Sequence, residues 1–345
     1  MKILFYSTKD FEKPFFKEAN PGNNQVDFLT EVLSVNTATM ANGYDCISVF
    51  TADDVSASVI RQLHTQGIGM IAIRAAGYDN VDLDAAIKNN MVVSNVPEYS
   101  PYSVAEHAVA LILSMNRKIV KAYEKVHARN FLLDDLVGFD LNKKTVGIIG
   151  TGRIGSVFAK IMHGFGCTIL AYDVTTSQSL INKYGVCYVD LPTLCRRSDI
   201  ISIHTPLTVQ TKYLIDEQHI KIMKTGVMLI NTARGGIVKT EEIIKYLETG
   251  QIGYYGMDVY EKEKGIFFFD RTGKSLNDSM LEKLLSLKNV LITPHQAFAT
   301  KEALCNIAST TFLNIDHWAK GVRSGNELTD TKKANQSIDR KIVTP

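Results

Sequence analysis

The sequence is poor in cysteine, and its cysteines are not grouped. Five cysteines occur in 345 residues, an odd number with no CxxC pair. Disulfide frameworks use an even number of cysteines, and structural zinc sites use closely spaced ones. The sequence therefore predicts neither a disulfide-stabilised domain nor a metal site. A reducing compartment, the cytoplasm, is the expected location.

Long apolar runs are also missing. Met1–Tyr6 are soon followed by Lys9, which leaves no room for the apolar region of a signal peptide. The most apolar helical stretch, Val104–Met115, is interrupted by Glu106 and His107 and is too short to cross a bilayer. We therefore expect no signal peptide and no membrane segment.

The chain has no excess of one charge. Its formal net charge is +2, and no basic block is strong enough to predict a nucleic-acid footprint. With 45% hydrophobic and 21% charged residues, the composition is that of a soluble globular protein. Small molecules are the expected partners.

Short β-rich apolar runs alternate with longer amphipathic segments throughout the chain. Such alternation builds parallel sheets covered by helices on both faces, with ligands at the carboxyl ends of the strands. The sequence therefore predicts an α/β protein with doubly wound parallel sheets. The predicted strands are Ile3–Tyr6, Ile47–Phe50, Met70–Ile73, Val92–Ser94, Thr145–Ile149, Thr168–Tyr172, Ile200–Ile203, Val227–Ile230, Gly256–Val259 and Val290–Ile292.

Two domains are expected, because 345 residues exceed the usual size of one core. The break follows Ser100, where a proline precedes a long predicted helix that runs from near Tyr102 toward Lys121 and bridges the domains. A late predicted helix, 301–320, has no strand after it and is expected to return to the first domain. The polar tail beyond Gly325 is expected to be partly disordered. The predicted boundaries are 1–100 plus 299–345 for one domain and 101–298 for the other.

A glycine-rich turn stands where a dinucleotide would bind. Gly150-Thr151-Gly152-Arg153-Ile154-Gly155 matches G-x-G-x-x-G, a pattern that 23 glycines in this chain produce about 0.1 times by chance. The motif follows a predicted strand, opens an amphipathic helix and precedes a second strand that leads to Asp173. The glycines let the backbone approach a pyrophosphate at the helix N-terminus, and the acid can bind a ribose 2′-hydroxyl.

Asp173 also predicts which dinucleotide binds. Its carboxylate would repel a 2′-phosphate, and neither Val174 nor Thr175 supplies a compensating cation. NAD is therefore predicted in preference to NADP. Arg153, inside the turn, is expected to contact the pyrophosphate, with a solvated surface arginine as the alternative.

Polar residues also follow four other predicted strands of the second domain. Because the carboxyl ends of parallel strands meet at one edge of a sheet, these segments should converge on the cofactor. They are Ile203–Thr208, Ile230–Val238, Gly256–Glu263 and Thr293–Phe298.

Three of these segments, NTARGGIV, MDVYEKE and PHQAF, together resemble the D-isomer-specific 2-hydroxyacid dehydrogenase family, and within it the D-lactate dehydrogenases. Arg74–Asp82 and Asn95–Pro101 of the first domain are similar to family segments too, so the resemblance covers nearly the whole chain. It implies a flavodoxin-like substrate domain, a Rossmann NAD-binding domain, and reduction of pyruvate to D-lactate with NADH. With the apolar bridging helix, it also implies a homo-oligomer.

The resemblance implies a catalytic set of Arg234, Glu263 and His295. A guanidinium can grip the carboxylate of a 2-keto acid and polarise its carbonyl. A histidine can donate and accept a proton near neutral pH, and a carboxylate beside the ring orients it. Glu261 and His204 are the alternatives for the second and third roles.

The remaining site residues are assigned by the same resemblance. The backbone N–H groups of Ala76 and Gly77 and the hydroxyl of Tyr99 are expected to hold the substrate carboxylate. Phe50 and Phe298 are expected to line the side-chain pocket, although both could be plain core. Besides the glycine-rich turn and Asp173, the cofactor residues are Thr205, Pro206, Thr211, Thr232, Ala233 and Asp258; Thr211 stands where many lactate-specific relatives carry an asparagine.

Two other functions fit the same residues. One is a dehydrogenase for a larger 2-keto acid, such as phenylpyruvate or 2-ketoisocaproate. The other is an NAD-sensing regulatory protein, because transcriptional corepressors of this family carry the same arginine, glutamate and histidine. The chain lacks a long appended interaction tail, which disfavours the regulatory alternative.

Overall fold

The computed structural model describes residues 1–22 and 24–329, and these divide into two compact units. The first unit holds Met1–Ser100 and the described residues from Thr300 onward, and the second holds Pro101–Ala299. Each unit is built on one parallel sheet. No helix among the described residues is both long and apolar enough to span a membrane.

The first unit contains a five-stranded parallel sheet with strand order β2-β1-β3-β4-β5. This is the flavodoxin-like order, in which the order of strand addition reverses between β1 and β3. The late helix returns to this unit, where α12 packs on α1 and β4. Its elements are β1 (Lys2–Phe5), α1 (Lys13–Ala19), β2 (Gln25–Phe28), the 3₁₀ turn η1 (Ala38–Ala41), β3 (Cys46–Val49), α2 (Ala57–Thr65), β4 (Met70–Ile73), α3 (Leu83–Lys88), β5 (Val92–Ser94) and α12 (Lys301–Ala319).

The second unit contains a seven-stranded parallel sheet with strand order β12-β11-β10-β9-β6-β7-β8. Counted within this unit, the order is that of a Rossmann fold with one added strand, and the switch point lies between β6 and β9. Its elements are α4 (Pro101–Asn116), α5 (Ile119–His127), β6 (Thr145–Ile149), α6 (Arg153–Gly164), β7 (Thr168–Tyr172), α7 (Gln178–Tyr184), β8 (Cys187–Tyr188), α8 (Leu191–Arg197), β9 (Ile200–Ile203), α9 (Glu217–Lys221), β10 (Val227–Asn231), the 3₁₀ turn η2 (Gly235–Ile237), α10 (Thr240–Glu248), β11 (Ile252–Met257), α11 (Ser279–Ser286) and β12 (Val290–Ile292).

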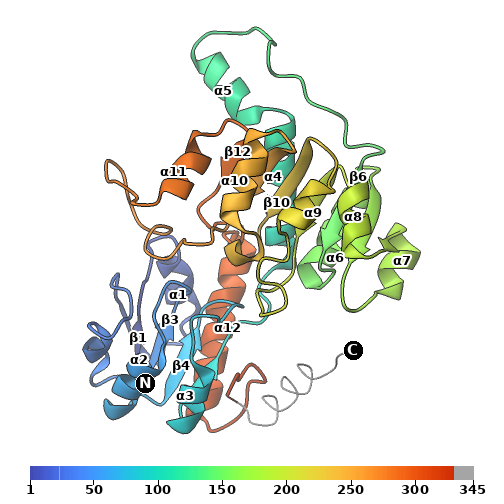
Figure 1. The fold of residues 1–345 in the computed structure, drawn as a ribbon. Helices are drawn as coiled ribbons and strands as arrows, with labels where there is room; N and C mark the ends of the chain where they lie inside the picture. Colours follow the sequence, from blue (N-terminus) through green and yellow to red (C-terminus); the bar gives the residue numbers. More distant parts are fainter. Residues whose placement is uncertain (23, 330–345) are drawn as a thin grey trace. The chain divides into compact units, whose positions relative to one another are not determined.

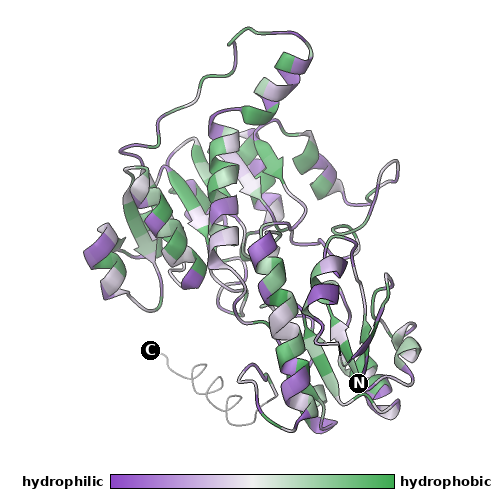
Figure 2. Ribbon diagram, turned by 180° about the vertical axis from the view of Figure 1, so that it is seen from behind, coloured by the Kyte–Doolittle hydropathy of each residue, from purple (hydrophilic) through white to green (hydrophobic). Residues whose placement is uncertain are grey.

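The central strands are apolar because helices cover both faces of each sheet (Figure 1). Every residue of β3, β4, β9 and β10 is buried. The strands are the most hydrophobic ribbons in Figure 2, whereas the helices mix hydrophilic and hydrophobic residues. The α/β class predicted from the alternating pattern is confirmed.

The long helix predicted from Tyr102 toward Lys121 is too long at its C-terminal end. α4 ends at Asn116, and Lys118 adopts a left-handed φ of 53° before α5 begins at Ile119. A residue in that conformation cannot continue an α-helix, so the chain changes direction there. The apolar periodicity continues across the break, which is why the sequence pattern did not reveal it.

One further predicted strand needs correction, and part of the predicted tail lies within the described residues. The strand predicted at Gly256–Val259 is β11, which spans Ile252–Met257. The chain leaves the sheet at Asp258, whose side chain accepts hydrogen bonds from the N–H groups of Gln296 and Ala297 in the turn after β12. The tail beyond Gly325, predicted to be partly disordered, begins with residues that lie along β5, since the Leu328 N–H donates to Val93 O at 2.7 Å. The rest of that prediction lies outside the described residues.

Candidate active site

The glycine-rich turn joins β6 to α6. Gly150 has a φ of +92°, a conformation that residues with a Cβ rarely adopt. A Cβ on Gly155 would collide with the Gly150 carbonyl oxygen, so the helix can start this close to the strand only with glycine. The first and third glycines of the motif are therefore required by the turn itself.

Gly152 differs, because a Cβ there would meet no protein atom within 4 Å. Its φ of −63° suits any residue, so the backbone does not demand a glycine. The open space lies at the N-terminus of α6, where helix N–H groups lack intrahelical partners. Arg153 and Ile154 form the first turn of this helix. The geometry fits a pyrophosphate lying against Gly152.

Asp173 follows β7 beside this turn. Its Oδ2 accepts hydrogen bonds from the Thr151 N–H at 2.5 Å and the Thr151 hydroxyl at 3.0 Å. Its Oδ1 accepts from the Thr175 N–H at 3.1 Å. The neighbouring Val174 is 98% exposed and places no cation beside the carboxylate. The residues present fit a dinucleotide whose ribose carries free hydroxyls.

The loops after β9 and β10 contain the predicted nicotinamide-side contacts. The buried hydroxyl of Thr232 has no hydrogen-bond partner among the described residues, which suits a polar group of a bound ligand. The Thr211 hydroxyl donates to Pro206 O at 2.6 Å and accepts from the Thr208 N–H at 2.7 Å. Thr211 therefore stabilises its own loop. A contact of Thr211 or Thr205 with the cofactor stays a prediction.

Arg234 lies in a tight turn after β10. The Asn231 amide braces the turn: it donates to Arg234 O at 3.0 Å and accepts from the Ala233 N–H at 3.1 Å. A Cβ on Gly235 would collide with the backbone at Tyr260. Glycine at this position thus lets the arginine turn press against the loop that follows β11.

That loop carries Glu263, which pairs with His295. The His295 Nδ1 lies 2.9 Å from Glu263 Oε1, and the Tyr260 N–H donates to Glu263 Oε2 at 3.0 Å. The two side chains are 15% and 27% exposed. Because the carboxylate engages Nδ1, Nε2 is the nitrogen left to meet a substrate.

The two alternative residues are engaged elsewhere. Glu261 accepts hydrogen bonds from the Tyr213 hydroxyl and from the Thr240 N–H, so it braces other loops. His204 pairs its Nε2 with the Ser202 hydroxyl at 2.9 Å, and its Nδ1 is buried without a partner among the described residues. Burial lowers the pKa of His204 to about 3, so its ring is neutral at physiological pH.

Aromatic rings flank His295. The Phe268 ring lies 5.6 Å from the imidazole, and the Phe298 ring lies 6.5 Å from it at nearly a right angle. Phe298 is 9% exposed, so it is buried beside the candidate acid. The apolar run that contains Phe268 thus packs against the turn that carries His295.

In the first unit, the predicted substrate residues follow β3, β4 and β5. None of the described hydrogen bonds uses the N–H groups of Ala76 and Gly77, while Ala76 O accepts from the Asn95 side chain at 2.7 Å. Tyr99 O accepts from the Asn306 side chain at 2.7 Å. Phe50 is 4% exposed. The roles of these residues toward a substrate stay predictions.

Comparison with known proteins identifies the family. The model described as "D-isomer specific 2-hydroxyacid dehydrogenase, NAD binding domain" matches residues 109–297. The chain belongs to the D-isomer-specific 2-hydroxyacid dehydrogenase family. It is therefore an NAD-dependent oxidoreductase, and the glycine-rich turn, the space at Gly152 and Asp173 are the features that fit NAD.

Individual relatives match over nearly the full length. D-lactate dehydrogenase kk1H of Curvularia clavata is 42% identical over 99% of this chain and 99% of its own length. D-lactate dehydrogenase of Escherichia coli (strain K12) is 42% identical over 95% of this chain and 100% of its own length. The structure of Aquifex aeolicus D-lactate dehydrogenase complexed with NAD and lactic acid is 34% identical, with a TM-score of 0.85 over 95% of this chain and 99% of that one.

The structure adds two residues to the site of this family member. His107, on α4, and Thr293, directly after β12, form a hydrogen-bond chain to Asp258. The sequence offered one signal for His107, a titratable side chain within an apolar helix, but there it only argued against a membrane span. The described residues contain no cluster of three or more His, Cys, Asp or Glu side chains able to hold a metal ion.

Proposed function

We propose that this family member reduces pyruvate to D-lactate with NADH. The observation that carries the proposal is that the Arg234 turn lies against the loop that holds Glu263, and that Glu263 pairs with His295. A guanidinium and an imidazole with a free Nε2 are the two groups that reduction of a 2-keto acid needs. The relatives of similar length described above are D-lactate dehydrogenases, which supports the same substrate.

In this proposal each side chain acts on one part of the substrate. NADH, when bound, supplies the hydride that adds to the carbonyl carbon. The Arg234 guanidinium binds the carboxylate in a planar fork and polarises the carbonyl. The His295 Nε2–H gives its proton to the carbonyl oxygen, and the C=O π pair becomes the O–H bond. Glu263 holds Nδ1, so the ring keeps the orientation that this transfer requires.

Two phenylalanines are proposed to limit the size of the substrate side chain. Phe298 lies beside His295, and Phe50 is the apolar residue that the resemblance assigns to the substrate side chain. We propose that they leave room for a methyl group and crowd larger groups. One methylene in a tight apolar pocket changes discrimination by about 1–3 kcal/mol, so other short 2-keto acids should also react.

The test is an NADH-absorbance assay on the purified chain with pyruvate, 2-ketobutyrate, 2-ketoisocaproate and phenylpyruvate. We expect the highest kcat/KM with pyruvate and D-lactate as the product by chiral chromatography. His295→Gln should lower kcat at least about 100-fold, the size of a general-acid effect. Phenylpyruvate outperforming pyruvate by orders of magnitude would assign a larger substrate. NADH binding without turnover of any of the four acids would favour the regulatory alternative.

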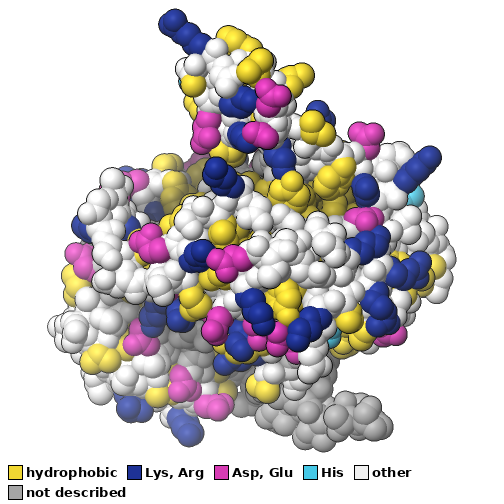
Figure 3. Space-filling model, turned by 45° about the horizontal axis from the view of Figure 1, so that its top comes forward, with side chains coloured by type: hydrophobic (Ala, Val, Ile, Leu, Met, Phe, Trp, Pro, Cys, Tyr) yellow, Lys and Arg dark blue, Asp and Glu magenta, His cyan; other side chains and the backbone are white. Residues whose placement is uncertain are grey.

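We further propose that the enzyme is a homo-oligomer whose subunits meet through an arm formed by residues 119–137. α5 and the loop after it project from the second unit (Figure 1), and Figure 3 shows apolar side chains together with charged ones on this projection. A monomer gains nothing from exposing so many large apolar side chains. The exposed ones, each at least half exposed, are Ile119, Val120, Tyr123, Val126, Phe131, Leu132, Leu133 and Val137.

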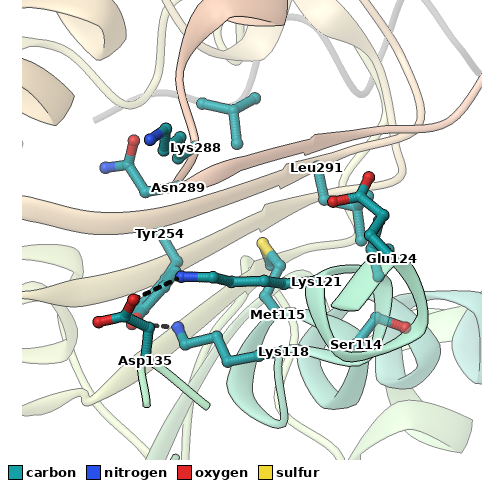
Figure 4. A pocket seen from close by; sticks show the side chains of 12 residues that line it. Ser114, Met115, Lys118, Lys121, Glu124, Asp135, Tyr254, Lys288, Asn289 and Leu291 are labelled. Carbon is teal, nitrogen blue, oxygen red and sulfur yellow. Dashed lines mark hydrogen bonds and ion pairs between the residues drawn. The ribbon is translucent and has the colours of Figure 1, made fainter. Parts of the chain in front are cut away.

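The proposed occupant of this surface is a second copy of the chain. A pocket of about 660 Å³ opens at the base of the arm, between α4, α5, β11 and β12 (Figure 4). Lys118, Lys121 and Lys288 line it together with Glu124, Asp135 and apolar residues, and Lys121 pairs with Asp135 at 3.2 Å. An apolar projection next to a pocket on the same unit suits two copies related by a twofold axis, because each copy then offers both surfaces to the other.

The expected location also stays a proposal. All five cysteines are free thiols in the structure, as a reducing cytoplasm would keep them. Cell fractionation that recovers the enzyme outside the cytoplasm would contradict it.

A further inference from the structure

We propose that His107 is a positioning residue for catalysis, because its hydrogen-bond chain through Thr293 to Asp258 fixes the turn that presents His295. The inference rests on the proposed function, in which His295 is the acid. It assigns a role to a histidine on α4 that the catalytic set does not include.

The chain of hydrogen bonds is short and lies wholly within the second unit. His107 Nε2 lies 2.9 Å from the Thr293 hydroxyl, which lies 2.6 Å from Asp258 Oδ1. His107 Nε2 is also 3.5 Å from the same carboxylate oxygen. Side-chain exposure is 16% for His107 and 0% for Asp258, so water competes little for these contacts.

The direction of the bonds follows from counting protons. A threonine hydroxyl has one proton to give. The carboxylate oxygen at 2.6 Å can only accept, so the hydroxyl proton points to Asp258. The hydroxyl therefore accepts from His107, and Nε2 carries a proton whether the ring is neutral or charged.

Asp258 in turn is hydrogen-bonded to the turn that carries His295. Its Oδ1 accepts from the Gln296 N–H and its Oδ2 from the Ala297 N–H, each at 2.8 Å. These two residues directly follow His295, whose φ of 57° is uncommon for a residue with a side chain. Backbone conformations of this kind persist only where the surroundings hold them. Asp258 supplies that hold, and His107 orients the hydroxyl that anchors Asp258.

Helix packing alone does not account for a histidine at this position. Ala105, Ala108, Leu111 and Ile112 of α4 are buried in the core beside the sheet and already fix the helix. An apolar residue at position 107 would serve that packing equally well. The histidine N–H that points at Thr293 instead helps to fix the turn that carries His295. Such a constraint is useful there, because efficient proton transfer requires a catalytic group to be placed within about 0.5 Å.

The test compares His107→Leu, which removes the donor, with His107→Gln, which keeps an N–H donor of similar reach. We expect the leucine variant to lose about 10-fold in kcat for both pyruvate reduction and lactate oxidation, a change of about 1.4 kcal/mol. The glutamine variant should recover most of that loss. NADH affinity, measured by fluorescence, should stay unchanged in both, because the glycine-rich turn is untouched.

Further variants separate an effect on positioning from an effect on folding. Thr293→Val should reproduce the loss and Thr293→Ser should restore it, while the double variant His107→Leu/Thr293→Val should be no worse than either single variant. His163→Leu, a surface histidine on α6 that contacts Tyr184, should behave as the unaltered enzyme. Melting temperatures should show that all variants are folded.

Nitrogen NMR of the histidine rings supplies a readout that needs no activity. The resonances of His107 should show a protonated Nε2, and those of His295 should move in His107→Leu but not in His163→Leu. Unchanged kcat in His107→Leu, equal losses in the leucine and glutamine variants, or an unprotonated Nε2 would overturn the inference. Absence of reductase activity in the unaltered enzyme would instead contradict the proposed function, and the NMR result would still decide the role of His107.

Discussion

Asp173 and Asp258 both follow strands of the seven-stranded sheet, yet their surroundings differ. Asp258 is fully buried, and both of its oxygens accept hydrogen bonds from the turn that carries His295. Asp173 lies beside the glycine-rich turn and next to a fully exposed residue, so its carboxylate can face a ligand. We therefore propose that the same residue type serves the acid–base turn at one strand end and the cofactor at another.

Removing the charge of Asp173 should narrow the preference for NADH. We expect Asp173→Asn to lower kcat/KM for NADH by about 10-fold, because a charged hydrogen bond to a ribose hydroxyl contributes about 1.5–3 kcal/mol. The kcat/KM for NADPH should fall less, because the 2′-phosphate of NADPH no longer meets a carboxylate. Steady-state kinetics with both cofactors measure the ratio. Equal efficiency with NADH and NADPH in the unaltered enzyme would refute the assignment.

His204 should make the fold sensitive to acid. Its pKa falls from 6.5 to about 3 on burial, so the unfolded chain binds the proton first and stability is lost as the pH falls from about 6.5 toward 3. As the pH falls from 7 to 5, His204 should lower the free energy of unfolding by on the order of 1–2 kcal/mol. Urea melts of the enzyme and of His204→Leu measure the effect, and the difference between their unfolding free energies should change across that range. A constant difference would contradict the burial of an uncharged ring.

Among the elements, the β6–α6 unit offers a matched pair of glycine variants. Gly155→Ala should destabilise the protein by several kcal/mol, because its Cβ would collide with the Gly150 carbonyl. Gly152→Ala should leave the melting temperature nearly unchanged and weaken NADH binding, because the new methyl group enters space that only a ligand would use. Thermal melts and NADH titrations distinguish the two effects. Full NADH affinity in folded Gly152→Ala would place the pyrophosphate elsewhere.

Strands that form short apolar runs could be predicted from the sequence, even at a sheet edge, as β5 and β12 show. Six strands, among them β4 and β9, match their predicted bounds because each is a short apolar run between turn residues. β2 and β8 were missed: β2 is only partly buried, and β8 has two residues, so neither makes an apolar run. The left-handed Lys118 that divides the predicted long helix depends on where the following loop goes, which no local pattern encodes.

The candidate site, too, could be predicted only in part from the sequence. Some site residues follow strands that the sequence predicts: the glycine-rich turn, Arg234, Glu263 and His295. The structure brings Glu263 and His295 within hydrogen-bond distance. The hydrogen-bond chain from His107 joins a helix to a strand end 186 positions away in the sequence. No spacing rule predicts such a contact, because it depends on the packing of α4 against β11.

Over the whole molecule, two parallel sheets each present their functional segments at strand ends. In the second unit the cofactor turn follows β6, and the Arg234, Glu263 and His295 segments follow β10, β11 and β12, on one side of the switch point between β6 and β9. This order lets one sheet position a cofactor and an acid–base pair with short loops. The arm departs from that plan, because it leaves the sheet and carries none of the proposed site residues.

The arm should therefore matter for assembly. Leu133 and Val137 are 76% and 84% exposed in the single chain, and burying each side chain in an interface contributes about 1.5–3 kcal/mol. Because a twofold interface buries every residue twice, Leu133→Asp/Val137→Asp should raise the dissociation constant at least about 100-fold and yield a smaller species in light scattering. Val35→Asp, at an exposed apolar position in the first unit, is the control and should leave the mass unchanged. A monomeric unaltered enzyme, or an arm variant with the original mass, would show that these residues do not hold copies together.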